Sequence, residues 1–151
     1  MNKSKVLFLC TGNSACSQMA EAFLRAYAAE HFEIYSAGLK PKGYILPEVL
    51  TVMNERGLNL SGQSSKGVKE YLGKYSFAHV ITVCADAEEN CPTIFLTMGK
   101  HEHWPFDDPA KFQGSDAEKL EYVRRIRDQI DQRIQEWLQG QNIQPSLDIQ
   151  K

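Results

Sequence analysis

The stretch VLFLCTGNSACSQMAEAFL, residues 6–24, decides the fold, because it joins an apolar run to a polar turn and then to a helical pattern. The run from Lys5 to Cys10 is apolar on both faces, as expected of a central strand in a parallel sheet. Small polar residues follow it, and the segment from Ser17 to Ala29 repeats its apolar positions at helical spacing. The stretch therefore predicts a strand–loop–helix unit.

A loop of this kind can direct several backbone N–H groups to one point, where the positive end of the helix dipole also acts. Such a nest binds tetrahedral oxyanions. Its donors also favour thiolate over thiol, so we expect a lowered pKa for Cys10 and regard it as the candidate nucleophile. A buried thiol at the end of a core strand is the alternative. The residues expected to form the anion-binding loop are Thr11, Gly12, Asn13, Ser14, Ala15, Cys16 and Ser17.

The segment from Cys10 to Glu21 resembles the anion loop of the thiol-dependent arsenate reductases, a branch of the low-molecular-weight phosphatase fold. That family carries CTGNSCRSQMAE, and this chain reads CTGNSACSQMAE with unchanged spacing. Ala15 replaces the family's cysteine, and Cys16 replaces its arginine. In the family the arginine holds the oxyanion with a planar fork that a cysteine cannot imitate. The resemblance extends from Lys5 to Trp137.

Composition sets the broad class. A chain of 151 residues with a hydrophobic fraction of 42% suits one soluble domain, which we expect over residues 1–140, followed by a polar tail over residues 141–151. The net charge of −2 argues against a nucleic-acid-binding surface. No signal peptide or membrane span is recognisable, so we expect a cytoplasmic location. We also expect a monomer without a metal or cofactor.

Alternating strands and helices predict a three-layer α/β/α fold with a four-stranded parallel sheet. Cys10 and Cys84 should both lie at the carboxyl ends of strands, where such sheets bind ligands. Ser115 and Glu118 form a capping box, and Gly140 is expected to end the last helix. The expected strands are Lys5–Cys10, Phe32–Ser36, His79–Val83 and Glu102–Trp104, and the expected helices are Ser17–Ala29, Glu48–Arg56, Val68–Leu72, Ala85–Asn90 and Ser115–Leu138.

Cys84 and Cys91 have six residues between them, which is too wide for a zinc knuckle. Two unrelated cysteines would be one explanation. The arsenate reductases have the same pair after the same strand. The resemblance implies that Cys10 attacks arsenate, Cys84 attacks the thiol–arsenic adduct, and Cys91 completes a disulfide that a thioredoxin- or glutaredoxin-type protein reduces.

Asp108 precedes a proline in a loop, where the family has its general acid; an Asp-Pro turn without catalytic role is the alternative. Glu21 and Ser36 match residues that support the loop in the family. Lys66 stands where the family has an aspartate that helps to hold potassium. We expect the Lys66 ammonium to replace that ion by pairing with Glu21, unless it is only a solvated surface group.

Three functions are compatible with these residues. The first is a thiol-dependent arsenate reductase weakened or adapted by the loss of the arginine. The second is a non-catalytic homologue that binds oxyanions or senses redox state. A thiol at Cys16 beside Cys10 permits either a Cys10–Cys16 disulfide or a dithiol site for a trivalent metalloid. The third is a low-molecular-weight tyrosine phosphatase. The cysteine pair favours the first.

Overall fold

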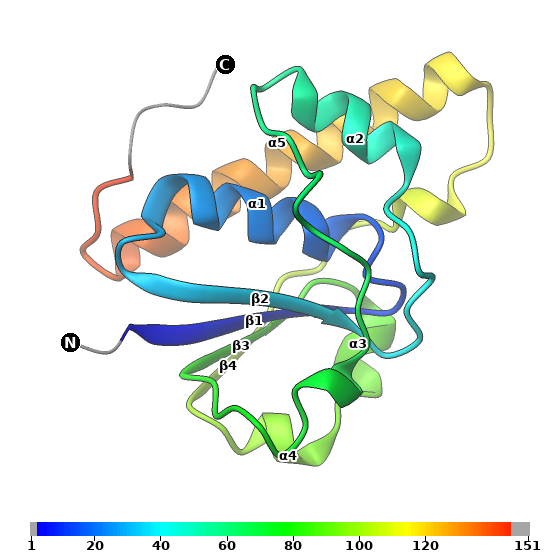
Figure 1. Cartoon of the computed structure of the whole chain (residues 1–151). Helices are drawn as coiled ribbons and strands as arrows, with labels where there is room; N and C mark the ends of the chain where they lie inside the picture. The colour runs from blue at the N-terminus through cyan, green and yellow to red at the C-terminus, as the bar shows by residue number, and fades with distance from the viewer. Residues whose placement is uncertain (1–2, 146–151) are drawn as a thin grey trace.

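The computed structural model describes residues 3–145, without the side chains of residues 85, 86 and 96. Its centre is a parallel sheet of four strands in the order β2-β1-β3-β4 (Figure 1). The strands are β1 (Ser4–Cys10), β2 (Phe32–Gly38), β3 (His79–Thr82) and β4 (Lys100–His103).

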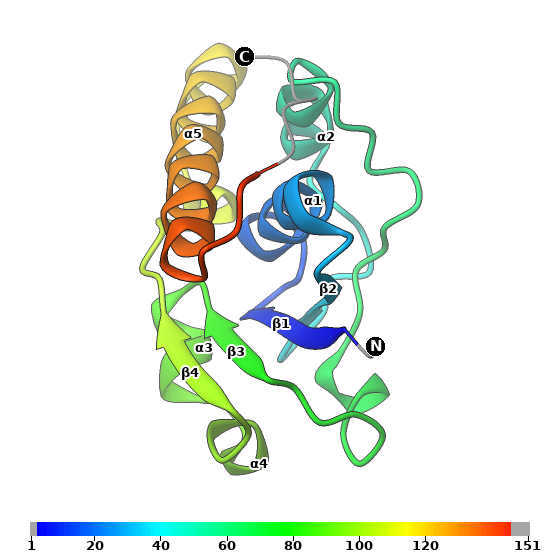
Figure 2. The same ribbon diagram turned by 90° about the vertical axis from the view of Figure 1, so that its left-hand side faces the viewer.

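Helices cover both faces of the sheet, which confirms the three-layer α/β/α prediction (Figures 1 and 2). Three long helices lie on one face, and short helical turns lie on the other. The long ones are α1 (Cys16–Ala28), α2 (Pro47–Asn54) and α5 (Asp116–Gly140). The short ones are η1 (Val68–Glu70), α3 (Ala85–Glu89) and α4 (Thr93–Leu96), while η2 (Pro109–Lys111) lies in the loop before α5.

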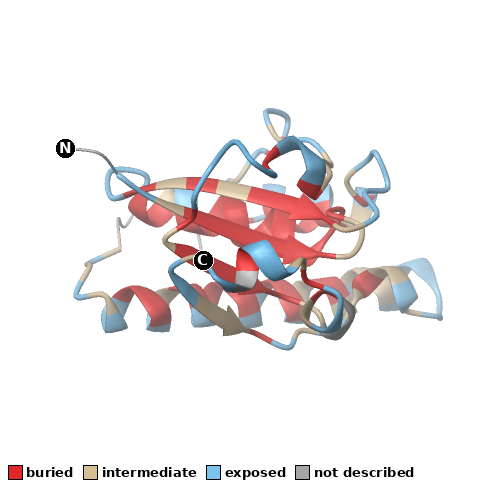
Figure 3. Cartoon of the chain, turned by 90° about the horizontal axis from the view of Figure 1, so that it is seen from below, coloured by how far each residue is buried: buried red, intermediate tan, exposed pale blue. Residues whose placement is uncertain are grey.

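Strand β1 supplies both halves of the core, because successive side chains on a strand point to opposite faces. Phe8 and Cys10 pack under the long helices, whereas Leu7 and Leu9 pack against the short ones. The central strands are accordingly buried on both faces, and the edge strand β4 is only partly covered (Figure 3). This burial explains the uninterrupted apolar run that marks β1 in the sequence.

Several predicted boundaries are wrong by one or two residues. Strand β2 continues past its expected end at Ser36 through Ala37 and Gly38, because Gly38 still pairs with Cys10. A Cβ at Gly38 would lie 2.6 Å from the Thr11 carbonyl oxygen, so only glycine allows this close approach. Strand β4 begins at Lys100 rather than Glu102 and ends before Trp104, which turns into the core.

The helices show similar shifts. The expected helix Val68–Leu72 is the short 3-10 turn η1, and α4 was not predicted at all. α5 does have the predicted capping box at Ser115 and Glu118, but Gly140 is its last helical residue rather than its cap. Of the expected tail over residues 141–151, the part from residue 146 lies outside the described residues. Ile143 donates its N–H to Leu138 and packs against the core.

Within residues 3–145, none of the helices is both long and apolar enough to cross a membrane.

Candidate active site

The loop between β1 and α1 turns its carbonyl groups outward. The carbonyl oxygens of residues 11–15 accept hydrogen bonds of 2.8–3.1 Å from groups elsewhere in the chain. In a planar trans peptide the next N–H points the opposite way. The N–H groups of residues 12–16 therefore face the other side of the loop, as the anion-nest prediction requires. In order, the donors to these carbonyls are the N–H of Lys40, the N–H of Lys42 together with the Ser65 hydroxyl, the side chain of Gln18, the N–H of Leu46 and the N–H of Met19.

Asn13 fixes the shape of this loop. It has a φ of 48°, in the left-handed region that asparagine tolerates better than most residues. Its side-chain amide is fully buried and donates to the hydroxyls of Ser17 (2.8 Å) and Ser36 (3.0 Å). Its side-chain oxygen accepts from the Gln18 amide and from the Lys66 N–H. Gln18, which the sequence analysis did not assign to the site, thus braces the loop.

A pocket of about 80 Å³ opens above the loop. It brings together four of the predicted residues from distant parts of the chain, namely Cys10, Cys16, Cys84 and Asp108. The rest of its lining comes from the loop and from three further residues, Lys40, Lys42 and Ala110. Asn13 and Ser17 support the loop from behind the pocket.

Cys10 is held at the base of the pocket by two contacts. Its Sγ lies 2.8 Å from the Ser17 Oγ and accepts the Asn13 N–H at 3.1 Å. Burial raises the pKa of the Cys10 thiol, although the Ser17 hydroxyl and the backbone N–H groups of Asn13 and Ser17 act in the opposite direction. The expected lowering of this pKa is therefore wrong, because desolvation of the thiolate outweighs the donors.

Cys16 occupies the first position of α1, where the related loops have arginine. Its thiol donates to the Asp107 carbonyl oxygen at 3.4 Å. Burial, followed by the nearby Cys10 and Asp108, raises the pKa of Cys16 well above its ordinary value. The side chain is therefore a neutral thiol near neutral pH, and it brings no positive charge to the pocket.

Cys84 and Cys91 lie at opposite ends of α3. Cys84 is partly exposed, and its Sγ is 3.5 Å from the Thr11 hydroxyl at the edge of the pocket. Cys91 is buried among the apolar side chains of the short-helix face, and burial raises its pKa to about 11. All four cysteines are free thiols. The structure brings Cys84 to Cys10 and leaves Cys91 outside the pocket lining.

Asp108 also lines the pocket. One oxygen of its carboxylate accepts the Ala110 N–H at 2.9 Å and thereby caps η2. The capping bond orients the side chain, so the turn role and the proposed acid role are compatible in one residue.

The predicted supporting residues meet beneath the loop. Glu21 is buried and accepts the Ser36 hydroxyl. The Lys66 Nζ lies 3.8 Å from Glu21, and the Arg25 guanidinium lies 2.7 Å from it. The i, i+4 spacing of Glu21 and Arg25 was a signal that the sequence analysis did not use. Among the described residues no cluster of histidine, cysteine and carboxylate side chains could hold a metal ion.

Comparison with known proteins places the chain among enzymes of one fold. The family model of low molecular weight phosphotyrosine protein phosphatases matches residues 5–147. An arsenate reductase of Shouchella clausii is 41% identical over 138 residues, which cover 91% of this chain and 96% of that protein. An arsenate reductase of Bacillus subtilis is 38% identical with the same coverage.

Solved structures agree with this similarity. An arsenate reductase in the phosphate-binding state has a TM-score of 0.76 and 29% identity, covering 91% of this chain and 98% of that one. A thioredoxin-dependent arsenate reductase of Corynebacterium glutamicum has a TM-score of 0.70 and 29% identity, covering 91% of this chain and 61% of that one. These similarities confirm the resemblance that was inferred from the loop.

Proposed function

The chain belongs to the low molecular weight phosphotyrosine protein phosphatase family, and within it we propose that the protein is a thiol-dependent arsenate reductase. The observation that carries this proposal is the position of Cys84, which shares the oxyanion pocket with Cys10 and is followed by the buried thiol of Cys91. Hydrolysis of a phosphate ester needs one thiol, whereas a two-electron reduction needs a second thiol to form a disulfide. The names of the relatives support the same substrate.

In the first step Cys10 attacks the arsenic of arsenate. The S–H bond of Cys10 and one As–O bond break, a sulfur–arsenic bond forms, and water leaves. Asp108 passes the proton to the departing oxygen, which makes that oxygen a better leaving group. The N–H groups of the loop bind the remaining oxyanion charge. Burial raises the pKa of Cys10, and we propose that an oxygen of the bound anion accepts the thiol proton.

In the second step the Cys84 sulfur attacks the Cys10 sulfur. The S–H bond of Cys84 and the sulfur–arsenic bond both break. The thiol proton passes to an oxygen of the departing group, and the electron pair of the sulfur–arsenic bond leaves with arsenic, which becomes arsenite. Two thiols have then lost two electrons to form a Cys10–Cys84 disulfide. Cys91 next attacks Cys84, which frees Cys10 and leaves a Cys84–Cys91 disulfide. A thioredoxin- or glutaredoxin-type dithiol reduces this bond by exchange.

The last exchange requires a local change of structure. A disulfide needs Cα atoms within ~7 Å, and the five residues of α3 lie between Cys84 and Cys91. We therefore propose that α3 unwinds when the disulfide forms. One tether to release is Glu88, which accepts the Thr82 hydroxyl at 2.6 Å and lies 2.8 Å from the His101 ring.

Loss of the loop arginine sets the expected strength of catalysis. Two charge-assisted hydrogen bonds are worth about 1.5–3 kcal/mol each. Their absence weakens oxyanion binding or turnover on the order of a hundred- to ten-thousand-fold when nothing replaces them. The nest and the helix dipole remain, so the pocket keeps part of its affinity. The monomeric state and cytoplasmic location stay predictions.

A coupled assay tests this function. Arsenate-dependent oxidation of NADPH is followed with a thioredoxin system and, separately, with a glutaredoxin system. We expect turnover with at least one of them, and none for Cys84→Ser or Cys91→Ser. Hydrolysis of a phenyl phosphate is measured in parallel. Ester hydrolysis without arsenate reduction would instead favour the phosphatase alternative. The absence of both activities would favour the non-catalytic alternative.

A further inference from the structure

The pocket keeps a source of positive charge although its loop has lost the arginine. Of the residues that line it, Lys40 and Lys42 carry a cationic side chain, and both come from the segment after β2 rather than from the loop. The lining also contains the carboxylate of Asp108 and the neutral thiol of Cys16. A doubly charged oxyanion would therefore meet its compensating side-chain charge at the two lysines.

The backbone holds this segment against the loop. The N–H groups of Leu39, Lys40 and Lys42 donate to the carbonyls of residues 10, 11 and 12 at 3.0, 2.8 and 3.0 Å. Lys40 and Lys42 both line the pocket, while Pro41 between them packs on Gly67, where an added Cβ would lie 3.3 Å from the proline Cγ.

The stem of Lys42 lies directly over Gly12. A Cβ added at Gly12 would come within 3.1 Å of the Lys42 Cγ, 3.2 Å of its Cε and 3.3 Å of its Cδ. Three stem carbons thus run across the glycine, in the manner of lysine stems that cover a surface while the ammonium stays solvated. Because Gly12 belongs to the anion loop, this packing carries the ammonium group along the rim of the pocket.

Among the described residues, no carboxylate lies within ion-pair distance of Lys40 or Lys42, in contrast to Lys66, which pairs with Glu21. An ammonium without a partner at the mouth of an oxyanion pocket lowers the energy of a bound anion. It also loses no existing ion pair when the anion enters.

We propose that Lys42, assisted by Lys40, binds the substrate oxyanion in place of the missing loop arginine. The inference rests on the proposed function only for the identity of the anion. Lysine is a point charge and cannot make the planar two-bond contact of arginine. The lysine-based site should therefore attract the anion but orient it less strictly, and its affinity should fall steeply with salt because the ammonium groups are exposed.

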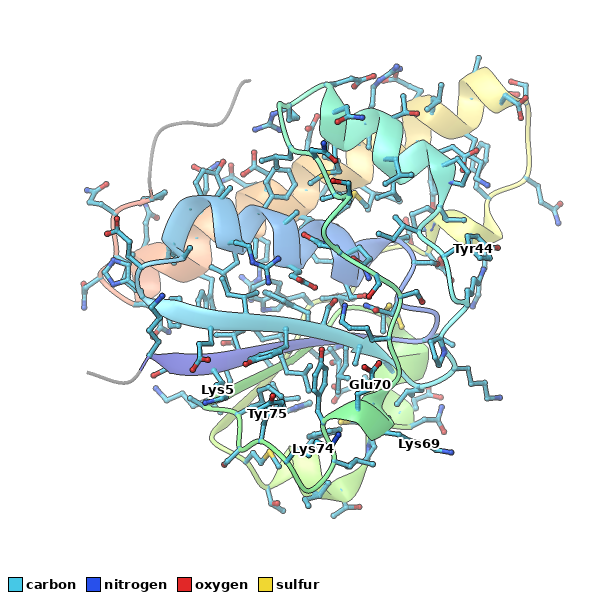
Figure 4. All side chains as sticks on the ribbon, viewed as in Figure 1. Lys5, Tyr44, Lys69, Glu70, Lys74 and Tyr75 are labelled. Carbon is cyan, nitrogen blue, oxygen red and sulfur yellow. The ribbon has the colours of Figure 1, made fainter. Side chains whose placement is uncertain are left out.

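The test is phosphate binding by titration calorimetry at low ionic strength. Lys42→Met keeps the stem and removes the charge, and we expect it to weaken phosphate binding about tenfold, a magnitude typical of one partly exposed charged contact. Lys40→Met should weaken phosphate binding less than Lys42→Met does. Lys42→Arg keeps the charge and should bind phosphate about as tightly as the parent. Lys74→Met is the matched control, because Lys74 is an exposed lysine on the short-helix side of the sheet and does not line the pocket (Figure 4). It should bind phosphate like the parent.

Two results would overturn the inference. One is Lys42→Met binding phosphate as tightly as the parent and the Lys74→Met control. The other is a parent that binds no phosphate at all. Arsenate reduction by the parent is measured separately with the coupled assay. Lysine-dependent phosphate binding without arsenate reduction would contradict the proposed function and support the lysine role. Arsenate reduction by the parent, with unchanged phosphate binding in Lys42→Met, would support the proposed function and contradict the lysine role.

Discussion

The Sγ of Cys10 lies 2.8 Å from the Oγ of Ser17, and this buried contact spans the loop that joins β1 to α1. The contact links the candidate nucleophile to the first turn of the helix whose dipole helps to bind the anion. It is also the strongest of the contacts that oppose the effect of burial on the pKa of Cys10. The reactivity of Cys10 is therefore a balance between desolvation and this hydrogen bond.

The raised pKa of Cys10 predicts a specific pH dependence of its alkylation. Only the thiolate reacts, so the rate should rise with pH and should not level off below pH 9.0, the ordinary value of a thiol. Ser17→Ala removes an interaction that favours the thiolate and should slow alkylation at fixed pH by about tenfold, the effect of one pKa unit. Peptide mass spectrometry after timed iodoacetamide treatment measures both effects.

Ser14→Ala is the control for that experiment, since Ser14 is a buried serine of the same loop and is not among the groups that shift the pKa of Cys10. A plateau near pH 7, or equal rates in the two variants, would contradict this account of Cys10.

Asp108→Asn should separate the acid role of this residue from its capping role. Asparagine caps a helical turn as well as aspartate does, so the bond from Ala110 and the fold should survive. It cannot donate a carboxyl proton, and turnover should fall by about 10²–10⁴ while phosphate binding is kept. Turnover equal to that of the parent would make Asp108 a turn residue only.

Glu88→Gln should loosen α3. The Thr82 hydroxyl, followed by the His101 ring, lowers the pKa of Glu88, which means that these contacts stabilise the carboxylate. They act above the ordinary pKa of glutamate and are lost as the pH falls through the lowered value. The neutral amide should weaken them and speed hydrogen exchange over residues 85–91. Glu89→Gln, an exposed change on the same helix, should not, and equal exchange in both variants would rule out Glu88 as the tether.

Cys16→Arg should restore the arginine that the related loops carry. The nest already defines the position of the oxyanion, so we expect a gain in arsenate reduction of at least about tenfold, below the full value of two charge-assisted bonds. If Lys42 replaces that arginine, Lys42→Met should cost less in the Cys16→Arg background than in the parent, because the two cations share one anion.

The outcome for Cys16 also separates the first two functions. Suppose that Cys16→Arg gains nothing, and that Cys16→Ser abolishes a Cys10–Cys16 disulfide or the binding of a trivalent metalloid. Cys16 would then be the functional residue, and the redox-sensing alternative would replace the reductase.

The sequence predicted the parts of the structure that local patterns control. The two-faced apolar run of β1 and the capping box at Ser115 appear as expected, and the loop after Cys10 leads into α1 one residue earlier than expected. The helix α4 was missed because one turn of TIFL has no periodicity to detect, and Phe95 holds it by packing into the core. Tertiary contacts decide such segments.

The site was predictable where a motif marked it and not elsewhere. Cys84 and Asp108 were found by resemblance, and the fold brings both to the pocket. Lys40 and Lys42 belong to no motif, and their place in the lining depends on the pairing of their segment with the loop. The direction of the Cys10 pKa shift was also out of reach, because it depends on how completely the fold excludes water from the thiol.

A single turnover with arsenate and no external reductant tests the central claim most directly. The fully reduced protein is mixed with excess arsenate, arsenite is quantified, and peptides are mapped without reduction. We predict one arsenite per chain together with a Cys84–Cys91 disulfide, whereas Cys91→Ser should stop at a Cys10–Cys84 disulfide. All four cysteines remaining alkylatable, with no arsenite formed, would contradict the proposal that this protein is an arsenate reductase.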